Sequence, residues 1–179
     1  MQGITACLWF DDQAEAAARF YTSVFRDAKL GSISRYGEAG AQASGRPVGS
    51  AMTVQFELAG QKFLGLNGGP QFKFSEAVSF VVNCESQQEI DDYWDKLSEG
   101  GTPGPCGWLK DKYGLSWQIV PVALSQMLMD KDPKRSGRVM AALLTMQKLD
   151  LPALERAYSG AAAEAGGRPA SAGAQSPRR

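Results

Sequence analysis

The sequence predicts an α+β fold in which two similar βαβββ modules are followed by a helical extension. The first observation is a repeat, because a strand-like run, an acidic residue and an amphipathic helix occur twice, 73 positions apart. Ala6 then corresponds to Ser79, and Phe20-Tyr21 to Tyr93-Trp94. The second observation is that the pattern after Pro121 is helical, with prolines at expected helix starts. Repeats at a fixed offset indicate a duplicated structural unit, so they decide the architecture.

The first module is predicted from apolar periodicity and turn residues. Residues 4–10 form an apolar strand, and residues 11–25 repeat apolar side chains at helical spacing. Asp11 or Asp12 is the expected N-cap of that helix, with Glu15 completing a capping box. Three further strands are expected at 29–37, 50–58 and 62–67. A loop rich in Gly, Ala and Ser is expected over 37–49.

The second module repeats this order. Residues 77–84 predict a strand, 85–101 predict an amphipathic helix, and two strands flank the polar turn within 106–121. The remaining strand is expected to be irregular, because Pro103 and Pro105 interrupt it. The predicted boundaries are 1–70 and 71–121 for the modules, 122–159 for the extension and 160–179 for a disordered tail.

Composition limits the possible functions. Lys+Arg and Asp+Glu both number 19, so the net charge is zero and nucleic acid is not an expected partner. No apolar run approaches the roughly 20 residues that span a bilayer, and the start of the chain does not resemble a signal peptide. We therefore expect a cytoplasmic protein without membrane contacts. Histidine is absent, and three separated cysteines predict neither a disulfide framework nor a zinc site.

Four stretches resemble one known family. LWFDDQAEAAARFY, LNGGPQFKF, SFVVNCESQQEIDDYWDKLSEGG and CGWLKDKYGLSWQIVP are similar to the PhnB-like branch of the vicinal oxygen chelate superfamily, which includes glyoxalase and bleomycin-resistance proteins. This branch is also called 3-demethylubiquinone methyltransferase-like. The resemblance covers about Ile4 to the 150s. It implies a glyoxalase-like fold in which paired modules enclose a cavity, and it implies a homodimer.

The resemblance also implies where a divalent metal would bind, on the first and last strands of each module. Those positions fall on Ile4 or Ala6, on Ala77 or Ser79, on one of residues 65–67, and on Gln118. His and Glu are the usual ligands there. Because a single neutral amide cannot hold a catalytic divalent ion, we predict no metal and no other cofactor.

Five residues are predicted to contact a ligand: Gln118, Asn67, Ser79, Phe72 and Trp108. Each has an ordinary structural alternative. Gln118 is equally compatible with pairing inside the fold, Asn67 precedes Gly68-Gly69 and fits a turn, and Phe72 fits a seal between modules. Trp9 and Trp117 are expected to pack beneath the helices. No catalytic residue is assigned.

The predicted function is a metal-independent binding protein that holds an apolar or aromatic small molecule between its modules. One alternative is a metal-dependent lyase, isomerase or dioxygenase of the glyoxalase type with an atypical site. Another is an interaction module that uses the extension. Methyl transfer is not expected, since no glycine-rich strand-to-helix turn is present to hold a nucleoside cofactor.

Overall fold

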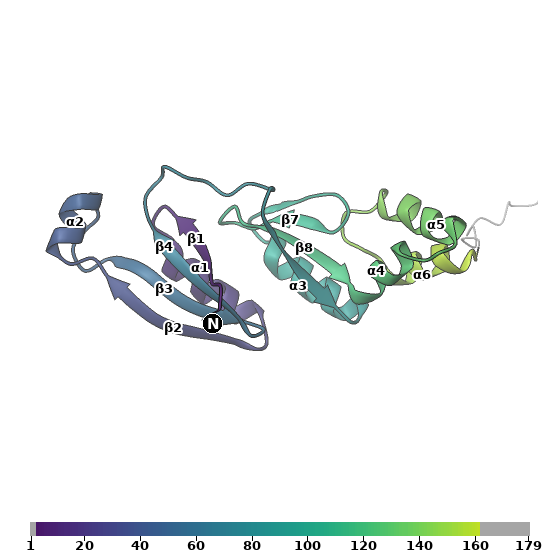
Figure 1. Cartoon of the computed structure of the whole chain (residues 1–179), viewed down its shortest axis with the longest axis horizontal. Helices are drawn as coiled ribbons and strands as arrows, with labels where there is room; N and C mark the ends of the chain where they lie inside the picture. Colours follow the sequence, from purple (N-terminus) through teal and green to yellow (C-terminus); the bar gives the residue numbers. More distant parts are fainter. Residues whose placement is uncertain (1–2, 162–179) are drawn as a thin grey trace, which may run out of the picture.

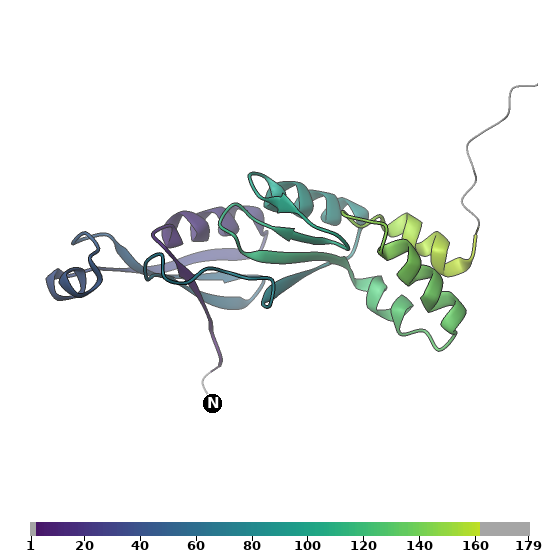
Figure 2. The ribbon, with the colours of Figure 1, turned by 90° about the horizontal axis from the view of Figure 1, so that it is seen from above.

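The computed structural model describes residues 3–161, which form two four-stranded sheets and six helices (Figure 1). The molecule is elongated, with the first sheet towards one end and the C-terminal helices at the other. Figure 2 shows α1 and α3 on the same side of the two sheets. The opposite sheet faces are left open, and we call each of them the open face. The described residues contain no helix long and apolar enough to cross a membrane.

The first module follows the predicted order of elements. The sheet has the order β1-β4-β3-β2, in which β1 is parallel to β4 and the other pairs are antiparallel. The predicted loop over 37–49 is only partly correct, because it contains the short helix α2 (Glu38–Ser44), which ends at a left-handed Gly45. The other elements are β1 (Ala6–Phe10), α1 (Ala14–Val24), β2 (Ala28–Arg35), β3 (Ala51–Leu58) and β4 (Gln61–Asn67).

The second module has the same topology, with sheet order β5-β8-β7-β6. Its elements are β5 (Ser79–Cys84), α3 (Gln87–Ser98), β6 (Thr102–Pro103), β7 (Trp108–Lys110) and β8 (Ser116–Pro121). The predicted irregular strand is β6, which is two residues long. Pro103 cannot donate a backbone hydrogen bond, and the hairpin loop begins directly after it. The duplicated module is therefore confirmed, with a shortened edge strand in the second copy.

The offset between the two modules differs by one residue between their helices and their first strands. Buried helix residues keep the offset of 73, as Tyr21 and Trp94 show. Residues on the helix side of the first strands are 74 apart, because Leu8 corresponds to Val82. The connection between strand and helix is one residue shorter in the second module. Since a strand alternates its faces, this single residue turns the aligned pair Ala6 and Ser79 to opposite sides of their sheets.

The expected cap of α1 is wrong. The residue before the helix is Gln13, and neither Asp11 nor Asp12 caps it. The amide Oδ1 of Asn67 at the end of β4 instead accepts a 2.8 Å hydrogen bond from the backbone N–H of Ala14. The N-terminal donor is thus satisfied by a residue 53 positions away, which spacing along the helix cannot reveal.

A buried carboxylate joins the two modules. Asp111 is 3% exposed and accepts hydrogen bonds from the Tyr21 hydroxyl and the Trp117 indole N–H, both at 2.8 Å. The backbone N–H groups of Tyr113 and Leu115 donate to its other oxygen at 2.8 and 3.0 Å. Burial raises the pKa of Asp111 despite these four donors. Tyr21 belongs to α1, so the first module is tied to the β7–β8 turn of the second.

The C-terminal helices form a cluster with its own core. α4 (Val122–Leu128), α5 (Pro133–Leu143) and α6 (Leu151–Ser159) bury Leu124, Val139 and Leu154 against one another. Backbone bonds from Cys106 to Met146 and from Gly107 to Gln147, each 2.7 Å, attach the cluster to the β6–β7 loop. The predicted tail at 160–179 lies outside the described residues except for its first two positions.

Candidate functional site

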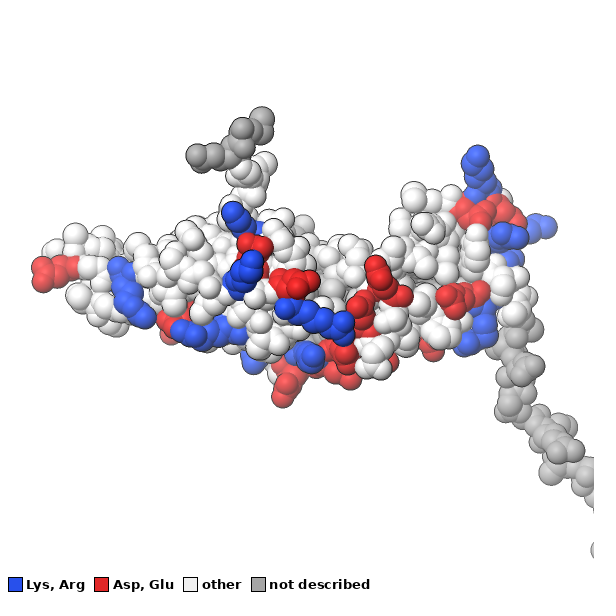
Figure 3. Space-filling model, turned by 90° about the horizontal axis from the view of Figure 1, so that it is seen from below, with Lys and Arg blue, Asp and Glu red and all other residues white. Residues whose placement is uncertain are grey.

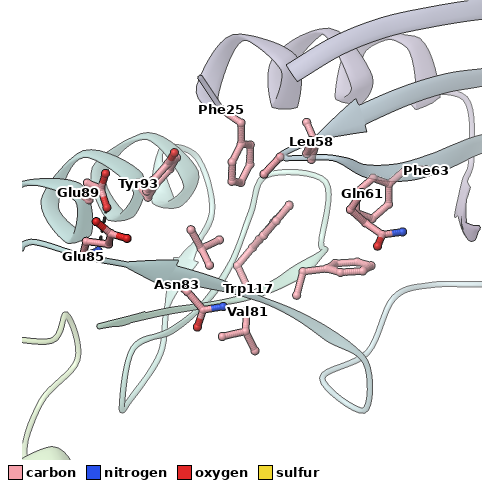
Figure 4. Close-up of a pocket in the computed structure, with 13 residues that line it drawn as sticks. Phe25, Leu58, Gln61, Phe63, Val81, Asn83, Glu85, Glu89, Tyr93 and Trp117 are labelled. Carbon is pink, nitrogen blue, oxygen red and sulfur yellow. Dashed lines mark hydrogen bonds between the residues drawn. The ribbon is translucent and has the colours of Figure 1, made fainter. Parts of the chain in front are cut away.

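A cavity of about 470 Å³ lies where the two modules meet, and we call it the intermodule cavity. Its walls come from both modules (Figure 4). Phe25 follows α1, and in Figure 4 its ring extends from that helix toward Trp117 of β8. The aromatic residues that line the cavity are Phe25, Phe63, Phe80, Tyr93 and Trp117.

The aromatic rings form a continuous series across the junction. Phe25 stacks on Tyr93 with ring centroids 5.1 Å apart, and Phe25 also lies 5.5 Å from Trp117. Phe80 lies 5.7 Å from Trp117 and meets Phe63 edge to face at 5.1 Å. Such pairs contribute about 0.5–1.5 kcal/mol each beyond burial, so the walls are held in place before any ligand arrives.

The cavity lining also includes the polar side chains Gln61, Asn83, Glu85 and Glu89. Glu89 accepts a 2.9 Å hydrogen bond from the backbone N–H of Glu85, and Arg26 lies 3.9 Å from its other oxygen. Burial, with the Glu89 charge, raises the pKa of Tyr93, so its phenol stays neutral at pH 7. Burial also raises the pKa of the nearby Cys84 thiol to about 12, which excludes a thiolate nucleophile there. The intermodule cavity therefore offers apolar contact and hydrogen-bonding groups but no activated nucleophile.

Three predicted ligand residues come together on the open face of the second sheet. Gln118 donates a 2.9 Å hydrogen bond from Nε2 to the hydroxyl of Ser79. Trp108 lies directly opposite Gln118 in the β7–β8 register, and Val81 is opposite it in β5. Gln118 thus has a partner within the fold, and its contact with a ligand stays a prediction.

The other two predicted residues lie elsewhere. Asn67 is buried, and both ends of its amide are used, since Nδ2 donates to Ala51 O at 3.0 Å. Phe72 is 64% exposed in the connection between modules, where its ring meets Trp9 edge to face at 4.9 Å. Trp9 also donates to Gly69 O at 2.8 Å, so the expectation that it packs beneath a helix is wrong. The expectation for Trp117 is confirmed, because it is 2% exposed in the core.

The residues present do not fit the metal that the superfamily pattern implies. Ala6 packs against the core rather than on the open face, and Gln118 is surrounded there by Ser79, Val81 and Trp108. Residues 3–161 contain no group of three or more His, Cys, Asp or Glu side chains arranged to hold a metal ion. A neutral amide and a hydroxyl are too few and too weak as ligands for a tightly held divalent cation.

Sequence reasoning missed Phe25, Phe63, Phe80 and Tyr93 as parts of one cavity. Tyr93 was visible in the repeat, and alternation along β5 signals which way Phe80 faces. No signal in the sequence indicates that Phe25 stacks on Tyr93 across the module junction, because that contact depends on how α1 and α3 lie side by side.

The topology defines the class of protein: two βαβββ modules with identical strand order are the vicinal oxygen chelate, or glyoxalase–bleomycin resistance, fold. Residues 2–120 match the family described as 3-demethylubiquinone-9 3-methyltransferase, and the chain belongs to this PhnB-like family. A comparison with curated protein sequences gives no match. α4–α6 begin beyond the matched region.

Solved structures agree with this assignment. A putative 3-demethylubiquinone-9 3-methyltransferase, PhnB protein, from Bacillus cereus is 37% identical, with TM-score 0.59, covering 68% of this chain and 100% of its own. Protein PA1353 from Pseudomonas aeruginosa is 17% identical, with TM-score 0.55, covering 68% of this chain and 98% of its own. The fosfomycin resistance protein FosX from Mesorhizobium loti is 14% identical, with TM-score 0.51, covering 73% of this chain and 99% of its own. The last two show the fold alone.

Proposed function

We propose that the protein binds a small apolar or aromatic molecule in the intermodule cavity, without a metal. The observation that carries this proposal is the set of five aromatic side chains from both modules around one space of about 470 Å³. Small-molecule sites typically measure about 300–1,000 Å³, are mostly apolar, and carry a few polar groups that orient the ligand. We assign that second role to Gln61, Asn83 and Glu85, which line the cavity.

We propose no methyl transfer, although the family and the Bacillus cereus relative carry that name. A nucleoside cofactor is usually held by a glycine-rich turn between a strand and the N-terminus of a helix. The paired glycines here, Gly68 and Gly69, follow β4 and lead into the irregular connection at Pro70. Gly68 also packs against the Trp9 indole, and Gly69 receives the Trp9 hydrogen bond, so both have structural roles.

The proposal includes a homodimer. Val81 on the open face of the second sheet is 50% exposed, and Val78, directly before β5, is 66% exposed, so a monomer leaves both apolar side chains in water. Figure 3, which views the molecule from below Figure 1, shows Lys and Arg interspersed with Asp and Glu over the side that it presents. Sedimentation equilibrium at several concentrations tests it, and a monomer throughout would contradict it.

Calorimetric titration with indole, a neutral aromatic probe, tests ligand binding. Gln61 and Phe63 share one face of β4, and Gln61 lines the cavity. Gln61→Trp should fill the space and weaken indole binding by at least about tenfold, corresponding to about 1.4 kcal/mol. Lys62→Trp is the matched control, because the adjacent residue points to the other face, and it should leave affinity unchanged.

Two results would contradict the proposal. One is the absence of indole binding to the parent protein, and the other is equal weakening by Gln61→Trp and Lys62→Trp. Elemental analysis of the purified protein tests metal independence separately. A stoichiometric divalent ion whose removal abolishes indole binding would revive the metal-dependent alternative.

A further inference from the structure

A second pocket, of about 450 Å³, lies in the second module beside the β6–β7 hairpin, and we call it the hairpin pocket. It shares no lining residue with the intermodule cavity. Its apolar wall is formed by Pro103, Pro105 and the half-buried indole of Trp108. Its polar side combines three different groups, which are the Lys110 ammonium, the Ser116 hydroxyl and the Glu76 carboxylate.

Ser116 is a polar residue buried in this pocket wall. It is 1% exposed, and among the described residues its Oγ has no hydrogen-bond partner. The β-ladders place Ser116 between Ser79 and Lys110 on the same face of the sheet. A buried hydroxyl without a partner is destabilising, so its presence in a pocket wall points to a partner that arrives with a ligand.

Lys110 provides a positive charge at the same place. Its ammonium is paired with Glu76, a residue of the connection between modules that is exposed at 65%. The hydrogen bond from Lys110 lowers the pKa of Glu76, so the carboxylate is charged at neutral pH. An exposed pair of this kind contributes little to stability, so a ligand carboxylate can replace Glu76 at small cost.

The wall opposite these groups is rigid. Two prolines fix the backbone on either side of Gly104, whose N–H donates to Trp108 O at 2.8 Å. The same loop is attached to the C-terminal helices by the backbone bonds of Cys106 and Gly107. Those helices lie beyond the family match at residues 2–120, so the support of the hairpin pocket is a feature of this chain's extension. A rigid wall lowers the entropy that a ligand must offset on binding.

We propose that the hairpin pocket binds a small aromatic carboxylate. The ring lies against Trp108 and the two prolines, and the carboxylate accepts hydrogen bonds from Lys110 Nζ and Ser116 Oγ in place of Glu76. Lys110 and Ser116 are neighbours across the β7–β8 ladder, which suits the two oxygens of one carboxylate. Glu76 is then a built-in competitor that tunes affinity.

The test is binding of benzoate to the full-length protein, with benzamide as its neutral counterpart, followed by calorimetry and by amide and indole NMR shifts. Benzoate should bind at millimolar concentration and shift the Trp108 indole signal. Lys110→Met should weaken benzoate by about tenfold and Ser116→Ala by about fivefold, while benzamide changes less than about twofold. Glu76→Gln should tighten benzoate binding by about threefold, because it removes the competing carboxylate.

Glu99→Gln is the matched control, since it removes an exposed carboxylate at the end of α3 that does not line the pocket, and it should have no effect. Equal affinity for benzoate and benzamide would overturn the proposal, as would a Glu76→Gln protein that binds benzoate no more tightly. Shifts centred on Tyr93 and Trp117 would overturn it too, because they would place benzoate in the intermodule cavity. Indole binding and its loss in Gln61→Trp are independent of all these outcomes.

Discussion

Asp111→Asn removes the carboxylate that joins the modules while keeping its size. The NH₂ group of the asparagine takes the position of Oδ2 in one orientation of the amide. It takes the position of Oδ1 when the amide is rotated by 180°. In the first orientation the NH₂ faces the donors of Tyr21 and Trp117, and in the second it faces the backbone N–H groups of Tyr113 and Leu115. The Tyr21 hydroxyl can rotate to accept, but the Trp117 indole N–H can only donate. The first orientation therefore leaves one buried donor unpaired, and the second leaves two.

The magnitude follows from that difference. One unpaired buried donor costs about 1–3 kcal/mol, and the remaining bonds lose the extra strength of a charged acceptor. Burying the charged carboxylate carries a cost, which is seen in the raised pKa of Asp111. The neutral asparagine avoids this cost, and that offsets part of the loss. We expect Asp111→Asn to lower the free energy of unfolding by about 2–4 kcal/mol.

Urea unfolding at pH 7, followed by fluorescence and circular dichroism together, measures this change. Trp117→Phe removes the indole N–H that Asp111→Asn leaves unpaired. It should therefore lower the free energy of unfolding less in the Asp111→Asn background than in the parent, and the difference should be about 1–2 kcal/mol. Additive losses, or a loss below about 0.5 kcal/mol for Asp111→Asn, would refute the reasoning.

The pH dependence has a definite sign. Because the folded-state pKa of Asp111 is raised, its protonated form is favoured by folding, and this contribution is fully present below the unfolded pKa of about 4. The contribution is lost as pH rises through the folded-state pKa. The stability of the parent relative to Asp111→Asn should therefore increase as pH falls through the raised folded-state pKa toward the unfolded value of about 4. A relative stability that falls on acidification would contradict the assignment.

Three further changes test other buried contacts by urea unfolding. Ser116→Ala should stabilise the ligand-free protein by about 1 kcal/mol, because it removes an unpaired buried hydroxyl, and a loss of stability would show that the hydroxyl has a partner. Asn67→Ala should cost about 2–3 kcal/mol through the uncapped Ala14 N–H without changing indole affinity, and a weakened affinity would support the predicted ligand contact instead. Gly107→Ala should cost about 2–4 kcal/mol, since φ is +83° and a Cβ would lie 2.8 Å from Ile119 O, and a neutral change would show that the loop can adjust.

Much of the architecture was predictable because it depends on periodic patterns. The duplicated order of strand, helix and three strands follows from the offset between Phe20 and Tyr93. The shortened strand at Pro103 also follows, since proline cannot take part fully in a ladder. The phase reversal between Ala6 and Ser79 did not follow, because a difference of one residue in a connection leaves the overall repeat intact and changes only the direction of side chains.

The candidate sites were less predictable because their residues meet only in three dimensions. Gln118 and Ser79 could be placed near each other from strand pairing, and their hydrogen bond agrees with that. The capping of α1 by Asn67 and the stacking of Phe25 on Tyr93 depend on contacts between elements far apart in sequence. Local propensity carries no information about such contacts, whereas it carries most of the information about the elements themselves.

The two candidate sites differ in what supports them. All lining residues of the intermodule cavity lie within the region matched by the family, and its walls are held by ring contacts between the modules. The hairpin pocket is also lined from that region, but its loop is attached to Met146 and Gln147, which lie beyond it. The first site therefore depends on the duplicated fold, and the second depends on a helical addition to that fold. Fold alone does not determine function, so the chemistry specific to this protein is best sought where the addition meets the module.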